Sequence, residues 1–229
     1  MNRIVRRRTR GFTLIELLVA ISLMALMAVL SWRGLDGISR AQTGLQQRSD
    51  DVLALQATLA QWGADLDAMT SQPDLPGLDW DGRALRILRR SSAAPDDGLQ
   101  VVAWAQRKDS AQGRGQWLRW QSPPVRTRTA LDQAWQKAAL WAQTPSDEDK
   151  AREVRTVALD QWQIYYYRNN AWTNPLSSAD GAPANPASPV VANPGVPDGV
   201  RLVLTISSGQ AISGTLTRDW VNPTIGGGK

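Results

Sequence analysis

Side chains that usually carry out chemistry are scarce in this chain of 229 residues. It contains no histidine and no cysteine. Their absence excludes Ser-His-Asp triads, cysteine nucleophiles, zinc thiolate sites and disulfides. An enzyme built from this sequence would need paired carboxylates, a Ser-Lys dyad or a metal held by oxygen atoms. The carboxylate clusters to consider are Asp79 with Asp81, Asp96 with Asp97, and Asp147 to Asp149.

Each of these clusters has a simpler structural interpretation. Asp97-Gly98 is typical of a turn, and Ser146 to Asp149 is typical of a capped helix start. No lysine lies in a Ser-x-x-Lys pattern. We therefore predict no catalytic residue, no cofactor and no metal ligand, although a calcium site held by oxygen atoms is left open.

One carboxylate stands apart from the clusters. Glu16 lies inside an apolar run from Phe12 to Leu30 that is otherwise interrupted only by Thr13 and Ser22. Such a run is long enough to cross a bilayer as a helix. A carboxylate inside a membrane span costs about 2.5 to 3.5 kcal/mol on insertion scales. Glu16 therefore predicts a functional partner of opposite charge.

Positive charge is concentrated before the apolar run. Five of the chain's basic residues precede it without any acid, namely Arg3, Arg6, Arg7, Arg8 and Arg10. The positive-inside rule keeps this segment in the cytoplasm and places the rest of the chain outside. The remaining chain carries as many acidic as basic residues, so its net charge does not indicate a nucleic-acid partner.

The segment from Arg10 to Ile21, RGFTLIELLVAI, resembles the type III signal sequence of type IV pilins and type II secretion pseudopilins. The resemblance implies that a prepilin peptidase cuts between Gly11 and Phe12 and methylates the new amine of Phe12. Glu16 would become the fifth residue of the mature chain. It would pair with the N-terminal amine of a neighbouring subunit during assembly.

These residues must be positioned by a long helix. Apolar residues recur at helical spacing to Met69, which predicts one helix from about Thr13 to Thr70 that Pro73 ends. Its second half is expected to place four residues on a sheet: Leu55, Leu59, Trp62 and Leu66. The opposite, polar face is expected to carry Arg40, Arg48, Asp50, Asp51, Asp65 and Asp67.

Later segments are strand-like, and one is helical. The predicted strands are Arg83 to Arg90, Leu99 to Gln106, Gln116 to Gln121, Val157 to Arg168, Gly199 to Ser207 and Ala211 to Trp220. Thr129 to Gln143 has helical spacing, and its tryptophans are expected to lie in the core. Trp172 and Trp220 could belong to a partner surface, but core is again the expected location. We predict an α+β, pilin-like fold, with a long N-terminal helix and a mainly antiparallel β head.

The expected layout has four segments. Residues 1–11 form a cytoplasmic leader, 12–32 a transmembrane and assembly helix, 33–72 its amphipathic periplasmic part, and 73–229 the periplasmic head. The head contains a Pro-rich stretch at 175–197, which is expected to be a surface loop.

The chain resembles the J-type minor pseudopilins of type II secretion in its length, in its lack of cysteine and in several of its late segments. The segments are Gln116 to Trp120, Ile164 to Arg168 with Ala171-Trp172, and Val200 to Ile206. The resemblance implies a structural subunit at the tip of a periplasmic pseudopilus, anchored in the inner membrane by a single span. It would help to start assembly and support the export of folded proteins across the outer membrane.

Partners implied by this resemblance are minor pseudopilins of the I and K types, with the H type as a further candidate, and the major pseudopilin. Prepilin peptidase, the inner-membrane assembly platform and the lipid bilayer complete the set. One alternative is a minor pilin of a type IV pilus that acts in adhesion, assembly or DNA uptake. Another is a periplasmic enzyme tethered to the membrane.

Overall fold

The computed structural model describes residues 11–72, 75–91, 94–108, 113–177 and 195–223. The chain divides into two compact units, residues 1–48 and 49–229, which are treated separately below. The Pro-rich stretch expected at 175–197 lies largely outside the described residues, as do the leader arginines and Pro73.

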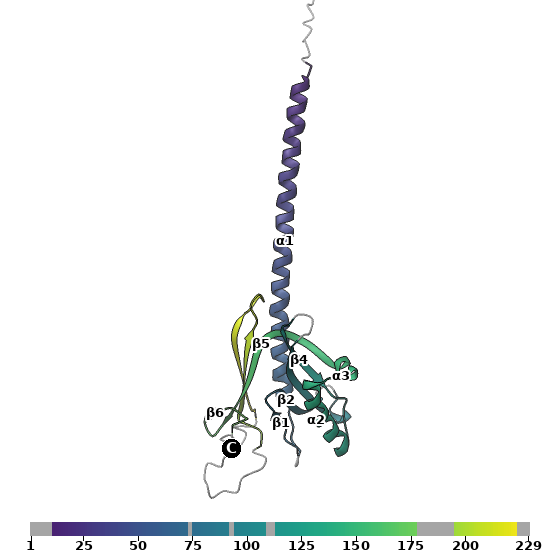
Figure 1. Ribbon diagram of the computed structural model, residues 1–229, viewed down its shortest axis with the longest axis vertical. Helices are drawn as coiled ribbons and strands as arrows, with labels where there is room; N and C mark the ends of the chain where they lie inside the picture. Colours follow the sequence, from purple (N-terminus) through teal and green to yellow (C-terminus); the bar gives the residue numbers. More distant parts are fainter. Residues whose placement is uncertain (1–10, 73–74, 92–93, 109–112, 178–194, 224–229) are drawn as a thin grey trace, which may run out of the picture. The chain divides into compact units, whose positions relative to one another are not determined.

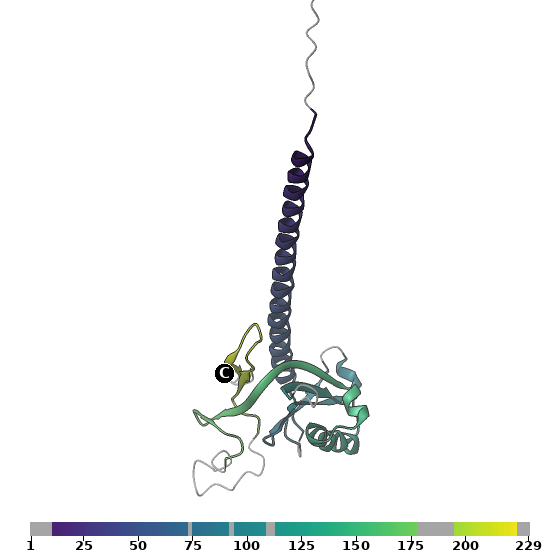
Figure 2. The same cartoon turned by 45° about the horizontal axis from the view of Figure 1, so that its top comes forward.

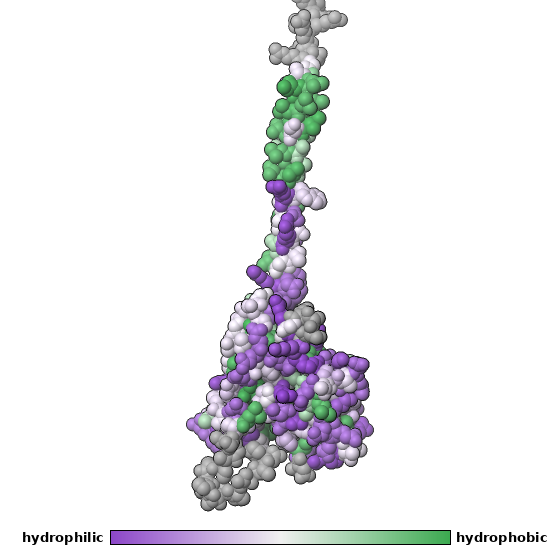
Figure 3. Space-filling model, in the orientation of Figure 1, coloured by the Kyte–Doolittle hydropathy of each residue, from purple (hydrophilic) through white to green (hydrophobic). Residues whose placement is uncertain are grey.

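Helix α1 spans Leu14–Asp67, close to the predicted 13–70. Its first part is long and apolar enough to cross a membrane, and its apolar side chains are exposed in the structure. Figure 3 shows this apolar surface in green. The helix ends three residues before the predicted Thr70, and Pro73, which was predicted to end it, lies outside the described residues. At this point Met69 bridges to Arg89, and the Arg90 N–H donates to the Ala68 carbonyl, so that sheet pairing replaces helical bonding.

The head is built on antiparallel strands (Figure 1). The strands of the described residues are β1 Leu78–Trp80, β2 Ala84–Arg90, β3 Leu99–Lys108, β4 Gly115–Gln121, β5 Glu153–Arg168, β6 Ala171–Thr173, β7 Gly199–Ile206 and β8 Gly214–Val221. Their order is β1-β2-β3-β4-β5-β7-β8, and β6 pairs with β5. The predicted antiparallel α+β head is confirmed, and the short strands β1 and β6 are additions to it.

Strand β5 joins the two halves of the sheet. Its first part, from Glu153, pairs with β4, and its second part, from Leu159, pairs with β7. Register shifts occur in both pairings, and Figure 2 shows β5 curving from beside α3 towards the β7–β8 hairpin. Asn169 and Asn170 have positive φ angles of 49° and 64°, which suit the two-residue turn from β5 into β6.

One face of the sheet packs against the second part of α1. The predicted stripe is confirmed, since Leu55, Trp62 and Leu66 are buried and Leu59 packs against the same cluster. Sheet tryptophans meet the stripe there. The rings of Trp104 and Trp117 lie 4.5 Å apart between centroids. Burying such large side chains is the main source of stability available to this layer.

The opposite face is covered by α2, Arg128–Gln143. The Thr127 side chain accepts a hydrogen bond from the Ala130 N–H and so caps the helix start. Trp135 and Trp141 of α2 are buried against the sheet, as predicted. The head therefore has a helix, sheet, helix arrangement, with tryptophan side chains in both interfaces.

The polar face predicted for α1 is wrong at Asp65. This residue is 0% exposed, and both of its carboxylate oxygens are bonded. Donors reach it from three strands: Arg89 of β2, Trp104 of β3 at 2.9 Å, and Arg119 of β4 at 2.7 and 2.8 Å. Gln61 of α1 itself donates at 3.0 Å. Asp65 is buried because these donors compensate its charge.

The neighbouring carboxylate Asp67 is also tied to the sheet. Its Oδ1 accepts a hydrogen bond of 2.8 Å from Trp220 Nε1 of β8. Trp220 is accordingly buried, as expected for core, whereas Trp172 is half-buried and lies 4.2 Å from the Arg201 guanidinium. Two carboxylates of one helical turn therefore fix α1 to β2, β3, β4 and β8 of the head.

Candidate functional site

The predicted cleavage position lies immediately before α1. Gly11, Phe12 and Thr13 are exposed, and the helix begins at Leu14. A Cβ atom added to Gly11 would meet no heavy atom within 4 Å. The fold itself therefore does not require glycine here, and any such requirement would have to come from a protein that binds this segment.

Thr13 and Glu16 form a capping box at the helix start. Glu16 Oε2 accepts hydrogen bonds of 3.0 Å from both the Thr13 N–H and the Thr13 hydroxyl. In return, Thr13 Oγ1 accepts one of 3.3 Å from the Glu16 N–H. From the sequence, Glu16 was predicted only as a partner for an amine, and this capping arrangement was not predicted. The pattern Thr-x-x-Glu directly before an apolar run was the signal that could have revealed it.

The charge of Glu16 is not compensated by these hydrogen bonds. Among the described residues Glu16 forms no ion pair, and its hydrogen-bond partners are atoms of Thr13. Ile15, Val19, Ala20 and Leu23 surround it and form a shallow apolar groove along one face of the helix. A charged carboxylate in such a groove favours a cation supplied by another molecule once water is excluded.

The candidate catalytic carboxylates of the head have structural roles instead. Asp81 Oδ1 accepts hydrogen bonds from the backbone N–H groups of Arg83 and Ala84, which closes the turn before β2. Asp79 is paired with Arg86, and Asp97 with Arg126. In the part of the chain that the structure describes, no group of three or more His, Cys, Asp or Glu side chains is placed to hold a metal ion.

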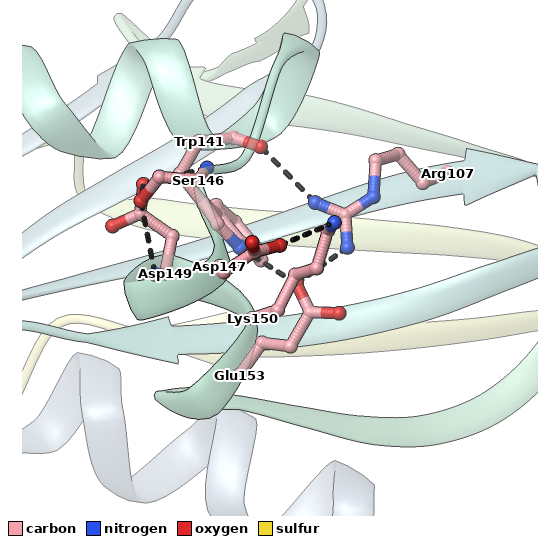
Figure 4. Close-up of polar contacts among 7 residues, drawn as sticks. All are labelled: Arg107, Trp141, Ser146, Asp147, Asp149, Lys150 and Glu153. Carbon is pink, nitrogen blue, oxygen red and sulfur yellow. Dashed lines mark hydrogen bonds and ion pairs between the residues drawn. The ribbon is translucent and has the colours of Figure 1, made fainter.

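The third cluster surrounds α3, Asp147–Ala151 (Figure 4). Ser146 and Asp149 form the predicted capped start, with a hydrogen bond of 2.6 Å between their side chains. Burial raises the pKa of Asp149, but hydrogen bonds from Ser146 and the nearby Lys137 charge outweigh that effect, so its pKa lies below the ordinary value. Asp149 is therefore ionised at neutral pH and is unsuited to donate a proton.

Glu153 completes this region by joining α2 to the sheet. Its Oε2 accepts a hydrogen bond of 2.9 Å from Trp141 Nε1 and is paired with Arg107 of β3. Arg107 also donates to the Trp141 carbonyl at 3.1 Å (Figure 4). Four of the carboxylates considered for catalysis therefore have local structural contacts, namely Asp79, Asp81, Asp97 and Asp149. The N-terminal segment is taken as the candidate site.

Two comparisons with known proteins match parts of this chain. Residues 6–32 match the model of the prokaryotic N-terminal methylation motif, a range that includes Gly11, Phe12 and Glu16. The chain is also 33% identical over 92 residues to type II secretion system protein J of Klebsiella pneumoniae. That alignment covers 40% of this chain and 44% of the relative, so it spans less than half the length of either protein.

A solved structure shows a weaker likeness. It is a chain of the GspK-GspI-GspJ complex from the type 2 secretion system of enterotoxigenic Escherichia coli, with 16% identity and a TM-score of 0.42. The match covers 75% of this chain and 96% of that one. The chain therefore carries a prokaryotic N-terminal methylation motif and, over part of its length, is similar to type II secretion system protein J.

Proposed function

We propose that the chain is a minor pseudopilin of a type II secretion system, a structural subunit of the pseudopilus tip. In this role it would help to start assembly and support the export of folded proteins across the outer membrane. The observation that carries the proposal is Glu16, an uncompensated carboxylate on an exposed apolar helix within a prokaryotic N-terminal methylation motif.

Cleavage would generate the cation that Glu16 lacks. In the uncut chain the nitrogen of Phe12 is an uncharged amide that follows Gly11. Cutting between these residues converts it into an ammonium and removes the arginine-rich leader. An ammonium next to a carboxylate in a low-dielectric helix bundle is strongly attracted to it. The proposal therefore makes processing the step that permits assembly.

The apolar helix would hold the subunit in the inner membrane until assembly. We propose a single span at residues 12–32, with the leader in the cytoplasm and the amphipathic segment 33–72 and head 73–229 in the periplasm. The support is the arginine-rich start and the exposed apolar part of α1. The head would then select partners, which we propose to be the I, K and H minor types and the major pseudopilin.

The test is co-assembly of the full chain. The tagged chain is co-expressed with the I, K and H minor pseudopilins from the same genome, solubilised in mild detergent, and purified by its tag. The wild type is expected to retain these partners. Glu16→Gln should still insert and be cleaved, but should recover them roughly tenfold less, because a buried ion pair is lost.

Ser22→Ala is the matched control for Glu16→Gln. This substitution removes a polar group from the same apolar run. The Ser22 hydroxyl donates a hydrogen bond of 2.8 Å to the Leu18 carbonyl of the same helix, so its loss should not affect contacts with another subunit. Full co-assembly of Glu16→Gln would overturn the role of Glu16. Absence of secretion partners from the wild-type preparation, together with recovery of type IV pilus proteins, would instead favour a minor pilin.

A further inference from the structure

The two edge strands of the sheet differ in how well they are protected from pairing with another chain. Strand β1 has three residues, whereas β8 has eight and pairs with β7 in unbroken register from Gly214 to Val221. Residues 215–221 contain no proline, lysine or glycine, and this pairing has no bulge. Proline and bulges are two of the devices by which natural sheets prevent an edge from pairing with another chain. Charged side chains are a third, and β8 carries them at Arg218 and Asp219. Figures 1 and 2 show β8 (yellow) at the border of the head.

The hydrogen-bonding pattern between β7 and β8 shows which backbone N–H and C=O groups of β8 point away from β7. The Asn222 N–H donates to the Asp198 carbonyl at 2.9 Å, so these opposed residues form a hydrogen-bonded pair. In an antiparallel ladder such pairs alternate with pairs whose N–H and C=O groups point away. The odd-numbered residues of β8 therefore direct their backbone groups away from β7: Thr215, Thr217, Asp219 and Val221.

The outward backbone groups have no partner within the described ranges. All four of these residues have exposed side chains, and Val221 is 71% exposed. On the other face of the strand, Trp220 is anchored to Asp67 of α1. The edge is therefore held firmly in place by the core while four N–H and four C=O groups remain available for pairing.

Charge indicates what could pair with this edge. Arg218 is exposed and has no ion pair among the described residues, whereas the neighbouring Asp219 is paired with Arg201 at 2.7 Å. A second copy of β8 is a poor match. The antiparallel register that pairs all four outward-facing residues, Thr215 with Val221 and Thr217 with Asp219, would place Arg218 directly opposite its counterpart, and like charges in that position are destabilising.

We infer that the outer edge of β8 binds an extended segment of a neighbouring pseudopilin subunit by strand addition. The segment would have β-branched residues at alternate positions and a carboxylate opposite Arg218. Main-chain hydrogen bonds to Thr215, Thr217, Asp219 and Val221 would provide affinity, and Arg218 would provide selectivity. This inference rests on the proposed function, because it assumes that partner subunits contact the head.

A proline at position 217 tests the main-chain contact. In Thr217→Pro the outward N–H is lost, while the ladder with β7 is kept because Thr217 does not donate to it. Thr217→Val is the matched control, since it keeps the N–H and the shape of the side chain. In the co-purification described above, Thr217→Pro is expected to recover the partner at least tenfold less, and Thr217→Val as much as the wild type.

Two further measurements test the same contact without a proline, in case Thr217→Pro does not fold. Arg218→Glu leaves the backbone intact and should also reduce recovery severalfold, whereas Arg218→Lys should not. A photo-crosslinking amino acid at Thr217 should label a partner subunit. The same amino acid at Leu140 of α2, which is 60% exposed, should not label it.

The outcomes separate this inference from the proposed function. Wild-type recovery of partners by Thr217→Pro, or labelling from Leu140 and not from Thr217, overturns strand addition and leaves the proposed function standing. A crosslink from Thr217 only to a second copy of the chain also overturns it. Failure of the wild type to recover any pseudopilin overturns both.

Discussion

At the scale of single residues, the N-terminal segment combines a glycine that the fold does not need with a carboxylate that its own helix satisfies only in part. Gly11 has open space around it, and Glu16 is bonded to Thr13 but not to a cation. Both features make sense if other proteins act on this segment. The assignment of Gly11, Phe12 and Glu16 to processing and assembly stays a prediction that substitutions can test.

Gly11→Val is expected to block processing. A branched side chain should not fit a peptidase site that selects glycine, although the chain itself has room for it. The measurement is the intact mass of the protein isolated from membranes, which should retain residues 1–11. Gly34→Val is the control, because Gly34 also has open surroundings but lies beyond the methylation motif. A mature-sized product from Gly11→Val would refute the assigned position.

At the scale of elements, α1 is attached to the sheet by charge as well as by apolar contact. Asp65→Asn should leave the buried guanidinium groups of Arg89 and Arg119 without their shared carboxylate. We expect a loss of about 3 kcal/mol in the free energy of unfolding, measured by urea denaturation with tryptophan fluorescence. Asp132→Asn, which breaks an exposed pair with Arg128, should cost at most about 0.5 kcal/mol. Equal effects of the two substitutions would contradict the role of Asp65.

The β7–β8 pairing should contribute a pH-dependent part of the stability. A hydrogen bond from Arg201 lowers the pKa of Asp219 below its ordinary value of about 3.9. Because the folded pKa is the lower one, the stabilisation is complete above the unfolded value and is lost as the pH falls through the folded value. Solvent screening keeps it at or below about 1 kcal/mol.

Asp219→Asn isolates this contribution. The difference in unfolding free energy between wild type and variant should be present at pH 7 and should shrink as the pH falls below the ordinary pKa of an aspartate and through the lower folded pKa of Asp219. Urea titrations at several pH values provide the measurement. A difference that stays constant from pH 7 to pH 2 would show that the ion pair is not its source.

At the scale of the whole molecule, the charge at the start and the apolar part of α1 predict one orientation in the membrane. A tag at the C-terminus should be digested by protease added to intact spheroplasts, because the head is expected in the periplasm. In inverted inner-membrane vesicles the tag should be protected. Protection in spheroplasts with digestion in vesicles would reverse the proposed topology and remove the basis for a pseudopilus role.

Features that depend on residues close together in the chain could be predicted from the sequence alone. The apolar run and its arginines predicted a membrane helix, and helical spacing predicted α1 and α2. Runs of β-forming residues bounded by turn residues predicted the six longer strands. The Thr-x-x-Glu and Ser-x-x-Asp patterns also define their caps locally. These features can be predicted because helix and strand periods, caps and turns depend on residues only a few positions apart.

Tertiary structure decided what depends on residues far apart in the chain. Spacing assigned Asp65 to a polar face, but two arginines and a tryptophan from three strands allow it to be buried. The residues that follow α1 pair with β2, and β5 became the strand that joins two halves of one sheet. The exposed edge of β8 likewise exists only once strand order is fixed. Whether a carboxylate is buried, where a helix ends and which strand lies at an edge all depend on the groups that folding brings next to them. Those groups are far away in the sequence, so local patterns do not reveal them.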